Sequence, residues 1–287
     1  FVYDVRFSPD GQTLATASRD NTVKLWRLDG SLITTLEGHT DDVYRVHFSP
    51  DGQTLASRSE GGTVKLWRLD GSLIATLDNL SFEQGMRFSP DGQMLASASW
   101  SMVKLWGLDG SLITTLEGHD GTVLDVHFSP DGQTLATASW DTTVKLWRLD
   151  GSLIATLEGH TSIVNDVRFS PDGQTLASAS NDSAVKLWRL DGSLITTLEG
   201  HAGAVYDVRF SPDGQTLATA SWDNTVKLWN NNLDDLMAWS CDWLHDYLST
   251  NPTVTDEERA ACDLPPREPQ LLSVWGHTVQ FVSRLFR

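Results

Sequence analysis

The sequence predicts an all-β fold, a β-propeller of about six four-stranded antiparallel blades with a small α-helical C-terminal appendage. Two strings carry this prediction, because Phe-Ser-Pro-Asp-Gly-Gln and Val-Lys-Leu-Trp each occur six times in the 287 residues. The tryptophans of the second string follow one another at intervals of 41, 39, 41, 41 and 41 residues. A repeat of about 40–45 residues is typical of propeller blades, which bury their faces against neighbouring blades.

Each repeat is expected to hold four short strands joined by tight turns. In the fourth repeat the turn at 130–132 is Pro-Asp-Gly, in which proline presets the first dihedral and glycine accepts a positive φ. A polar turn at 140–142 separates the next two strands, and the Asp-Gly at 150–151 is a hairpin signal. The expected strands are residues 123–129, 134–139, 143–147 and 152–157.

The repeats define a propeller domain over residues 1–229, after which the period stops. Residues 230–266 are expected to form a helical hairpin, because apolar residues between 233 and 248 recur at helical spacing. Asn232 is a suitable N-cap for the first helix, and Thr-Asp-Glu-Glu at 255–258 fits a capping box for the second. The expected blades lie near residues 1–37, 38–77, 78–116, 117–157, 158–198 and 199–229.

The tail, residues 267–287, partly imitates a repeat. Its Leu-Leu-Ser-Val-Trp-Gly-His at 271–277 echoes Leu-Ile-Thr-Thr-Leu-Glu-Gly-His. The sixth repeat lacks a fourth strand of its own, so one hypothesis is that residues 271–276 supply it. The alternative is an amphipathic or non-native end without structural consequence.

The chain is strongly acidic, since 38 Asp and Glu against 21 Lys and Arg give a formal charge of −17. Such a surface repels phosphate backbones and anionic headgroups, so we expect neither nucleic acid nor membrane as a partner. No apolar run approaches the roughly 18 residues that span a bilayer, and no signal peptide is present. The start at Phe1, inside a repeat and without Met, indicates a fragment or a processed product.

Only two cysteines occur, Cys241 and Cys262, and both lie outside the repeats. Their scarcity fits a reducing cytoplasm better than a disulfide framework. Together with His245 they could supply three zinc ligands, but a fourth is not evident. Packed thiols or one disulfide pinning the hairpin are simpler, so the sequence predicts no metal and no cofactor.

The motifs resemble those of the WD-repeat family of β-propellers, over residues 1–229. The chain has the paired Gly-His of that family and its turn aspartate, and it ends the motif with Trp-Arg in place of Trp-Asp. The near-identical repeats and the Cys-Asp-Trp-Leu at 241–244 resemble bacterial members. The matching pairs are Gly38-His39, Gly118-His119, Gly159-His160 and Gly200-His201, and the matching aspartates are Asp20, Asp141, Asp182 and Asp223.

The resemblance implies a buried hydrogen-bond relay in each blade, running from tryptophan through serine and histidine to aspartate. The residue types suit it, because indole only donates, a carboxylate only accepts, and hydroxyl and imidazole do both. Thr137 shares a strand face with Ser139 and is its rival. The expected sets are Trp147, Ser139, His119 and Asp141; Trp188, Ser180, His160 and Asp182; and Trp229, Ser221, His201 and Asp223.

These Ser, His and Asp residues do not indicate a hydrolase. A catalytic triad occurs once, beside an exposed nucleophile and an oxyanion hole, whereas this set repeats and includes a tryptophan. The sequence also lacks Gly-x-Ser-x-Gly, Gly-x-x-x-x-Gly-Lys and His-Glu-x-x-His. We therefore expect a non-enzymatic protein with no catalytic residue.

Two repeats depart from the relay pattern and are expected to be the softest. The third replaces Leu-Glu-Gly-His by residues 77–80 and has a shortened turn without aspartate, and the second has Gly61 at the aspartate position. Arg58 stands where other copies have alanine, and Glu83 where they have valine. Because unpaired buried charge is costly, one hypothesis pairs these two, with Glu60 as a competing acid and random drift as the alternative.

Two variable columns are candidates for partner binding, since the resemblance places both on the face where partners dock. Trp and Tyr are enriched among the anchors of protein interfaces. The alternative is that these rings pack between blades. The column before the turn aspartate is Arg19, Glu60, Trp100, Trp140, Asn181 and Trp222, and the first-strand column includes Tyr3, Tyr44 and Tyr206.

The sequence therefore predicts a scaffold that binds other proteins, or an upstream domain of its own polypeptide, through one face of a propeller. One alternative is the C-terminal sensor of a larger signalling NTPase or protease, as in many bacterial proteins that the chain resembles. Another is a glycan or small-ligand binder, for which the same aromatic columns would serve.

Overall fold

The computed structural model describes residues 1–77, 85–231 and 255. The chain divides into two compact units, Phe1–Asn231 and Asn232–Arg287. The first unit holds every strand described below. The predicted helical hairpin, the closing strand at 271–276, the two cysteines and Glu83 lie outside the described residues.

The strands of the first unit form six antiparallel sheets, each built from consecutive strands. The first sheet contains β1 (Val2–Phe7), β2 (Thr13–Ser18), β3 (Val23–Arg27) and β4 (Leu32–Leu36). The second contains β5 (Val43–Phe48), β6 (Thr54–Ser59), β7 (Val64–Arg68) and β8 (Leu73–Leu77). The third contains β9 (Met86–Phe88), β10 (Met94–Ser99), β11 (Met102–Gly107) and β12 (Leu112–Glu117).

The remaining sheets repeat this order. The fourth contains β13 (Val123–Phe128), β14 (Thr134–Ser139), β15 (Val144–Arg148) and β16 (Leu153–Leu157). The fifth contains β17 (Val164–Phe169), β18 (Thr175–Ser180), β19 (Val185–Arg189) and β20 (Leu194–Leu198). The sixth contains β21 (Val205–Phe210), β22 (Thr216–Ser221) and β23 (Val226–Asn230), three strands among the described residues. Within the described residues the prediction of six repeated antiparallel β-sheets is confirmed, although the sixth has three strands there rather than four.

The Ser-Pro-Asp-Gly string is repeated because it builds the first turn of every sheet. In the first sheet Ser8 Oγ donates to Asp10 Oδ1 at 2.5 Å and accepts the backbone N–H of Thr13 at 2.9 Å. Gly11 has a φ of 69°, which a side chain would disfavour. The first turns of successive sheets also lie against one another, since Pro9 Cδ of the first sheet lies 3.5 Å from where a Cβ on Gly52 of the second would be.

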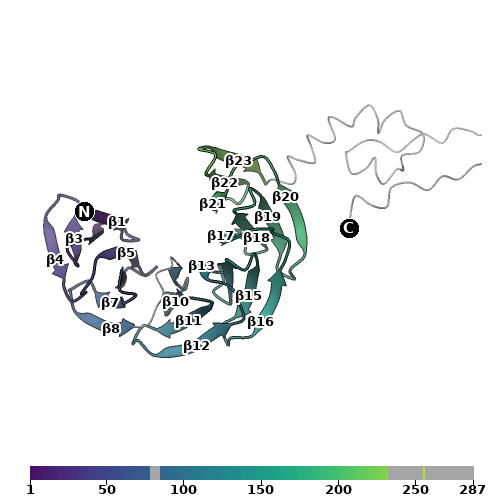
Figure 1. Ribbon diagram of the computed structural model, residues 1–287. Coiled ribbons are helices and arrows are strands. Elements are labelled where there is room, and N and C mark those ends of the chain that lie inside the picture. Colours follow the sequence, from purple (N-terminus) through teal and green to yellow (C-terminus); the bar gives the residue numbers. More distant parts are fainter. Residues whose placement is uncertain (78–84, 232–254, 256–287) are drawn as a thin grey trace, which may run out of the picture. The chain divides into compact units, whose positions relative to one another are not determined.

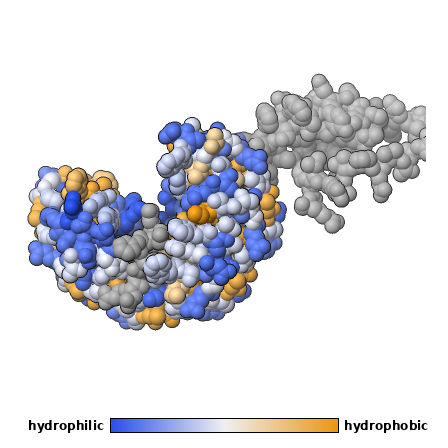
Figure 2. All heavy atoms as spheres, viewed as in Figure 1, coloured by the Kyte–Doolittle hydropathy of each residue, from blue (hydrophilic) through white to orange (hydrophobic). Residues whose placement is uncertain are grey.

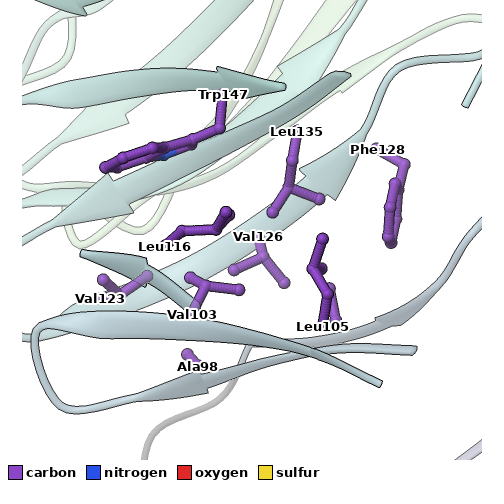
Figure 3. Packing of buried hydrophobic residues seen from close by; sticks show 10 residues of the cluster. Ala98, Val103, Leu105, Leu116, Val123, Val126, Phe128, Leu135 and Trp147 are labelled. Carbon is purple, nitrogen blue, oxygen red and sulfur yellow. The ribbon is translucent and has the colours of Figure 1, made fainter. Parts of the chain in front are cut away.

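The core lies between the sheets rather than within one. Five clusters of buried hydrophobic residues each join two successive sheets. Between the third and fourth sheets, Leu105 and Val103 of β11 pack against Val126 of β13 and Leu135 of β14, beside Trp147 (Figure 3). Each sheet thus depends on its neighbours for burial, which is the propeller arrangement.

Within this unit the sheets follow one another around an arc, with the first and the sixth at its ends (Figure 1). The face in view is largely hydrophilic, with separate hydrophobic groups, one of them over the first sheet (Figure 2). The end sheets expose side chains whose equivalents are buried elsewhere, including Val5 at 52% and Leu228 at 72%. Within the described residues no helix has the length and hydropathy to cross a membrane.

Candidate binding face

The relay that the sequence implies is present in the fourth, fifth and sixth sheets. In the fourth, Trp147 Nε1 donates to Thr137 Oγ1 at 2.9 Å, and that oxygen lies 2.7 Å from His119 Nε2. His119 Nδ1 lies 2.6 Å from Asp141 Oδ2. A neutral imidazole protonated at Nδ1 satisfies every link, because indole only donates and carboxylate only accepts.

The hydroxyl expected in this relay was the wrong one. Thr137, not Ser139, links tryptophan and histidine, and in the next two sheets Ser178 and Thr219 do so in place of Ser180 and Ser221. Trp147 pairs in register with Leu135, and Thr137 is two residues along the strand from Leu135. Ser139 is two residues further from Trp147 than Thr137 is, about 6.6 Å along the strand, because each strand residue rises about 3.3 Å. Ser139 instead donates to the carbonyl of Gly121 at 3.1 Å and accepts the N–H of Asp141 at 3.1 Å, which stabilises the turn.

The second and third sheets hold partial relays. In the second, His39 Nε2 lies 2.7 Å from Ser57 Oγ, but His39 Nδ1 is buried without a hydrogen-bond partner. Gly61 replaces the aspartate, and the carboxylate of Asp41 occupies the place that a Cβ on Gly61 would take. Burial, with a smaller contribution from Lys65, lowers the pKa of His39 to about 4. In the third sheet Trp106 Nε1 donates to Ser97 Oγ at 2.8 Å.

Three tryptophans of the first candidate column are largely exposed. Trp100 is 65% exposed, Trp140 51% and Trp222 72%. Arg19 and Glu60 are exposed as well, whereas Asn181 is half-buried. The alternative that the rings are buried between blades therefore does not hold for these three tryptophans.

Contacts between the two columns place them on one face. Asn165 Nδ2 donates to Asn181 Oδ1 at 2.8 Å, and the rings of Tyr206 and Trp222 lie 6.0 Å apart. Each pair joins a first-strand residue to the turn residue of its own sheet. The two columns therefore lie side by side in the fifth and sixth sheets, and the repeat gives the other sheets the same positions. We call the candidate residues of both columns the aromatic face: Tyr3, Arg19, Tyr44, Glu60, Trp100, Trp140, Asn181, Tyr206 and Trp222.

The first two sheets contribute a polar cluster to the aromatic face. The rings of Tyr3 and Tyr44 lie 4.5 Å apart across the junction, and Tyr3 Oη donates to Asp42 Oδ2 at 2.9 Å. Arg19 Nε lies 3.8 Å from the same carboxylate oxygen. The hydrogen bond to Asp42 raises the pKa of Tyr3 to about 12, so the phenol stays protonated and can donate.

A second set of charged residues, on the first strands, was missed by the sequence reasoning. Arg168 on β17 bridges Asp125 on β13 and Asp166 on its own strand, with nitrogen–oxygen distances of 2.8 Å to each. Asp166 Oδ2 also accepts the N–H of Val208 in the next sheet at 3.0 Å. The repeated Asp-Val-Arg/His-Phe on the first strands is the signal that could have found this network. It ties the fourth, fifth and sixth sheets together.

Burial and the neighbouring charges together shift the pKa values of this network. Burial opposes ionisation of Asp125, but the guanidinium groups of Arg168 and Arg87 outweigh it and lower the pKa of Asp125 to about 2. Burial and the neighbouring Asp125 carboxylate raise the pKa of Asp166 well above its usual range. Burial and nearby arginines lower the pKa values of His47 and His127 to about 3. Both imidazoles are therefore neutral at physiological pH.

The hypothetical partner of Arg58 and the candidate zinc ligands lie outside the residues that the structure describes. Arg58 is only 5% exposed and faces Arg45 in register, but its hypothetical partner Glu83 lies outside the described residues. In the part of the chain that the structure describes, no three His, Cys, Asp or Glu side chains are grouped to hold a metal ion. Cys241, His245 and Cys262 are not among those residues.

Comparison with known proteins agrees with this geometry. The family model for the WD domain, G-beta repeat, matches residues 1–27, 30–68, 84–107, 110–148, 151–189 and 192–230. A U4/U6 small nuclear ribonucleoprotein PRP4-like protein of Arabidopsis thaliana is 60% identical over 35 residues, which is 12% of this chain and 6% of that protein. The aligned stretch is shorter than one repeat, so it indicates a shared repeat and carries no further role.

Proposed function

Because the chain belongs to the WD-domain, G-beta repeat family, we propose that it is a non-catalytic scaffold whose aromatic face binds another protein. WD40 repeats generally mediate protein–protein interactions. The observation that carries the assignment to this face is the exposure of Trp100, Trp140 and Trp222, each by half or more. Exposed aromatic side chains on rigid turns provide large contact area at low entropic cost, which is what interface anchors need.

The proposal also covers the kind of organism, the cellular compartment and the partner. The near-identical repeats support a bacterial signalling protein, and the scarcity of cysteine supports the cytoplasm. The partner is either a separate protein or an upstream domain of the same polypeptide. The charge of −17 supports a protein partner over nucleic acid or an anionic membrane.

The test is an affinity pull-down from source-cell lysate that compares the intact chain with a Trp100→Ala, Trp140→Ala, Trp222→Ala variant. The matched control replaces three exposed leucines of the outer strands, Leu112, Leu153 and Leu194, by alanine; they are 51%, 46% and 44% exposed. We expect a protein partner that the tryptophan variant loses and the leucine variant keeps. Equal recovery by both variants, with each shown to be folded, would move the binding site away from the aromatic face.

Saccharide binding is the outcome that would favour the glycan alternative. A sugar would quench single tryptophans and would not need all three, whereas a protein spans several blades. Fluorescence titration of the three single variants separates these results, since loss of affinity confined to one substitution argues against a protein partner.

A further inference from the structure

The first strands of the six sheets carry a basic residue at one shared position. Strands β1, β5, β13, β17 and β21 lie on the inner side of the arc, and β4, β8, β12, β16 and β20 lie on its outer side (Figure 1). The inner strands therefore differ in charge from the chain as a whole, whose formal charge is −17. We call these residues the basic column: Arg6, His47, Arg87, His127, Arg168 and Arg209.

Arg87 is the arginine of this column that has no acid on its own strand. Each of the other arginines has an aspartate two residues earlier, on the same face of the strand. In the third sheet Gly85 stands at that position. The pairs elsewhere have nitrogen–oxygen distances of 3.3, 2.8 and 3.1 Å, in Arg6–Asp4, Arg168–Asp166 and Arg209–Asp207.

The guanidinium of Arg87 shares the carboxylate of a neighbouring sheet. Arg87 Nη2 lies 3.5 Å from Asp125 Oδ1, whereas Arg168 Nη1 lies 2.8 Å from Asp125 Oδ2. One acid thus serves two arginines, and the shorter contact belongs to Arg168. Arg87 Nη1 donates to the carbonyl of Met86 at 3.1 Å, which helps to hold the guanidinium in place.

Two histidines of the basic column flank Arg87 on the neighbouring strands. Strand β9, which carries Arg87, contacts both β5, with His47, and β13, with His127. The second sheet also has Arg45 where most copies have aspartate. At these two positions of the three inner strands, the charged groups are therefore two arginines and the single carboxylate of Asp125, beside two imidazoles.

Two buried nitrogen atoms close to this group have no hydrogen-bond partner among the described residues. They are Nδ1 of His127 and Nε of Arg168, whose side chain is 5% exposed. The Nε–H of an arginine can only donate, and a buried donor without an acceptor is costly in free energy. The ring of His127 is stacked on that of Phe169, with centroids 6.2 Å apart. An acceptor from outside the chain would satisfy these groups.

The electrostatics of the group favour the same kind of ligand. Burial and, to a smaller extent, Arg168 lower the pKa of Arg87, although Asp125 opposes them. Burial and nearby arginines, Arg87 among them, lower the pKa values of His47 and His127 to about 3. Positive charge is therefore disfavoured on this strand face, and a bound anion would remove part of that cost.

We propose that Arg87, with His47 and His127 on either side, binds the phosphate group of a small anion on the inner side of the arc. A guanidinium donates to two oxygens of a phosphate at once, and an imidazole N–H donates to a further one. Donors on three neighbouring strands suit a tetrahedral oxyanion, whereas a planar carboxylate offers two oxygens. Because salt screens charges beyond about 8 Å, a single phosphate group interacts mainly with the adjacent cations, and the acidic exterior still repels a polyanion.

The experiment is an NMR titration of the full-length chain with inorganic phosphate at pH 7, against sodium chloride of equal ionic strength. The signals of the His47 and His127 rings and of the Arg87 side chain report on the site. Arg87→Gln removes the central cation. The matched control is Arg148→Gln, which removes the same charge at the end of β15, where Arg148 is exposed and contacts Ser152. Circular dichroism checks that each variant is folded.

We expect saturable shifts in the parent and a dissociation constant about tenfold or more higher in Arg87→Gln, because a hydrogen bond to a charged group contributes that much. Arg148→Gln should bind as the parent does, and Arg87→Lys should lie between, since it keeps the charge but loses the planar fork. Shifts without saturation, shifts that sodium chloride reproduces, or an equal loss in both glutamine variants would overturn the proposal.

A parallel titration with adenosine monophosphate separates the two sources of a phosphate group. Tighter binding of the nucleotide than of inorganic phosphate, with the same loss in Arg87→Gln, would support an organic phosphate as the ligand. Tighter binding of inorganic phosphate would support the free ion. Nucleotide binding that Arg87→Gln leaves unchanged would place the nucleotide elsewhere and would contradict its assignment to the basic column.

Discussion

His39, the buried histidine of the second sheet, lacks the carboxylate partner that the equivalent histidines of other sheets have. His160 Nδ1 lies 2.8 Å from Asp182, whereas His39 Nδ1 is buried without a partner and Asp41 fills the space beside Gly61. The fourth, fifth and sixth sheets, which have a complete relay, have a small residue at the position of Asp41, namely Gly121, Ser162 and Gly203. The aspartate is thus displaced from the turn to the loop, where it does not bond to the imidazole.

Exchanging the two residues should restore the relay. We expect the Asp41→Gly, Gly61→Asp variant to be more stable by about 1–2 kcal/mol, because a buried donor gains a charged acceptor. The pKa of His39 should rise from about 4, since the new carboxylate favours the imidazolium. Thermal unfolding and an NMR titration of His39 measure both. The Gly61→Asp single variant is the control, and it should gain less because Asp41 blocks the site.

At the scale of strands and turns, the repeated strings predicted the sheets well because local chemistry dictates them. Pro-Asp-Gly builds the same turn in every copy, and alternating apolar residues require the same inter-sheet burial. The relay hydroxyl could not be chosen from the pattern, since Thr137 and Ser139 share a strand face and only register separates them. The Asp125–Arg168 network was missed because it joins sheets, and one repeat read alone cannot show that contact.

The same inter-sheet network predicts acid sensitivity. The pKa values of His47 and His127 are about 3 in the folded protein because burial and nearby arginines disfavour their charge, against about 6.5 when unfolded. The unfolded state therefore binds more protons between pH 6.5 and 3, so stability falls as pH falls through this window. Aspartates with lowered pKa values lose their contribution only below about pH 3.8. Because His39 and His160 also have lowered pKa values and Asp166 has a raised one, the contribution of His47 and His127 is taken from the difference between the parent and a variant that lacks them.

We expect each of these histidines to cost about 2 kcal/mol of stability between pH 7 and pH 5. Urea unfolding at the two pH values measures the loss, and a His47→Gln, His127→Gln variant should lose correspondingly less. His245→Gln serves as the control. A variant with the same pH dependence as the parent would contradict the assignment.

At the scale of the whole molecule, one repeated leucine measures whether the outer side of the sixth sheet is covered in solution. Leu187 and Leu228 occupy the same place in Val-Lys-Leu-Trp, but they are 7% and 72% exposed. Leu187→Ala should cost about 2–4 kcal/mol through lost burial and a cavity. Because Leu228 is largely exposed, Leu228→Ala should cost much less than Leu187→Ala in urea unfolding, and a similar cost would show that this leucine is covered in solution. A loss below about 0.5 kcal/mol, typical of surface substitutions, would show that this face is open in solution.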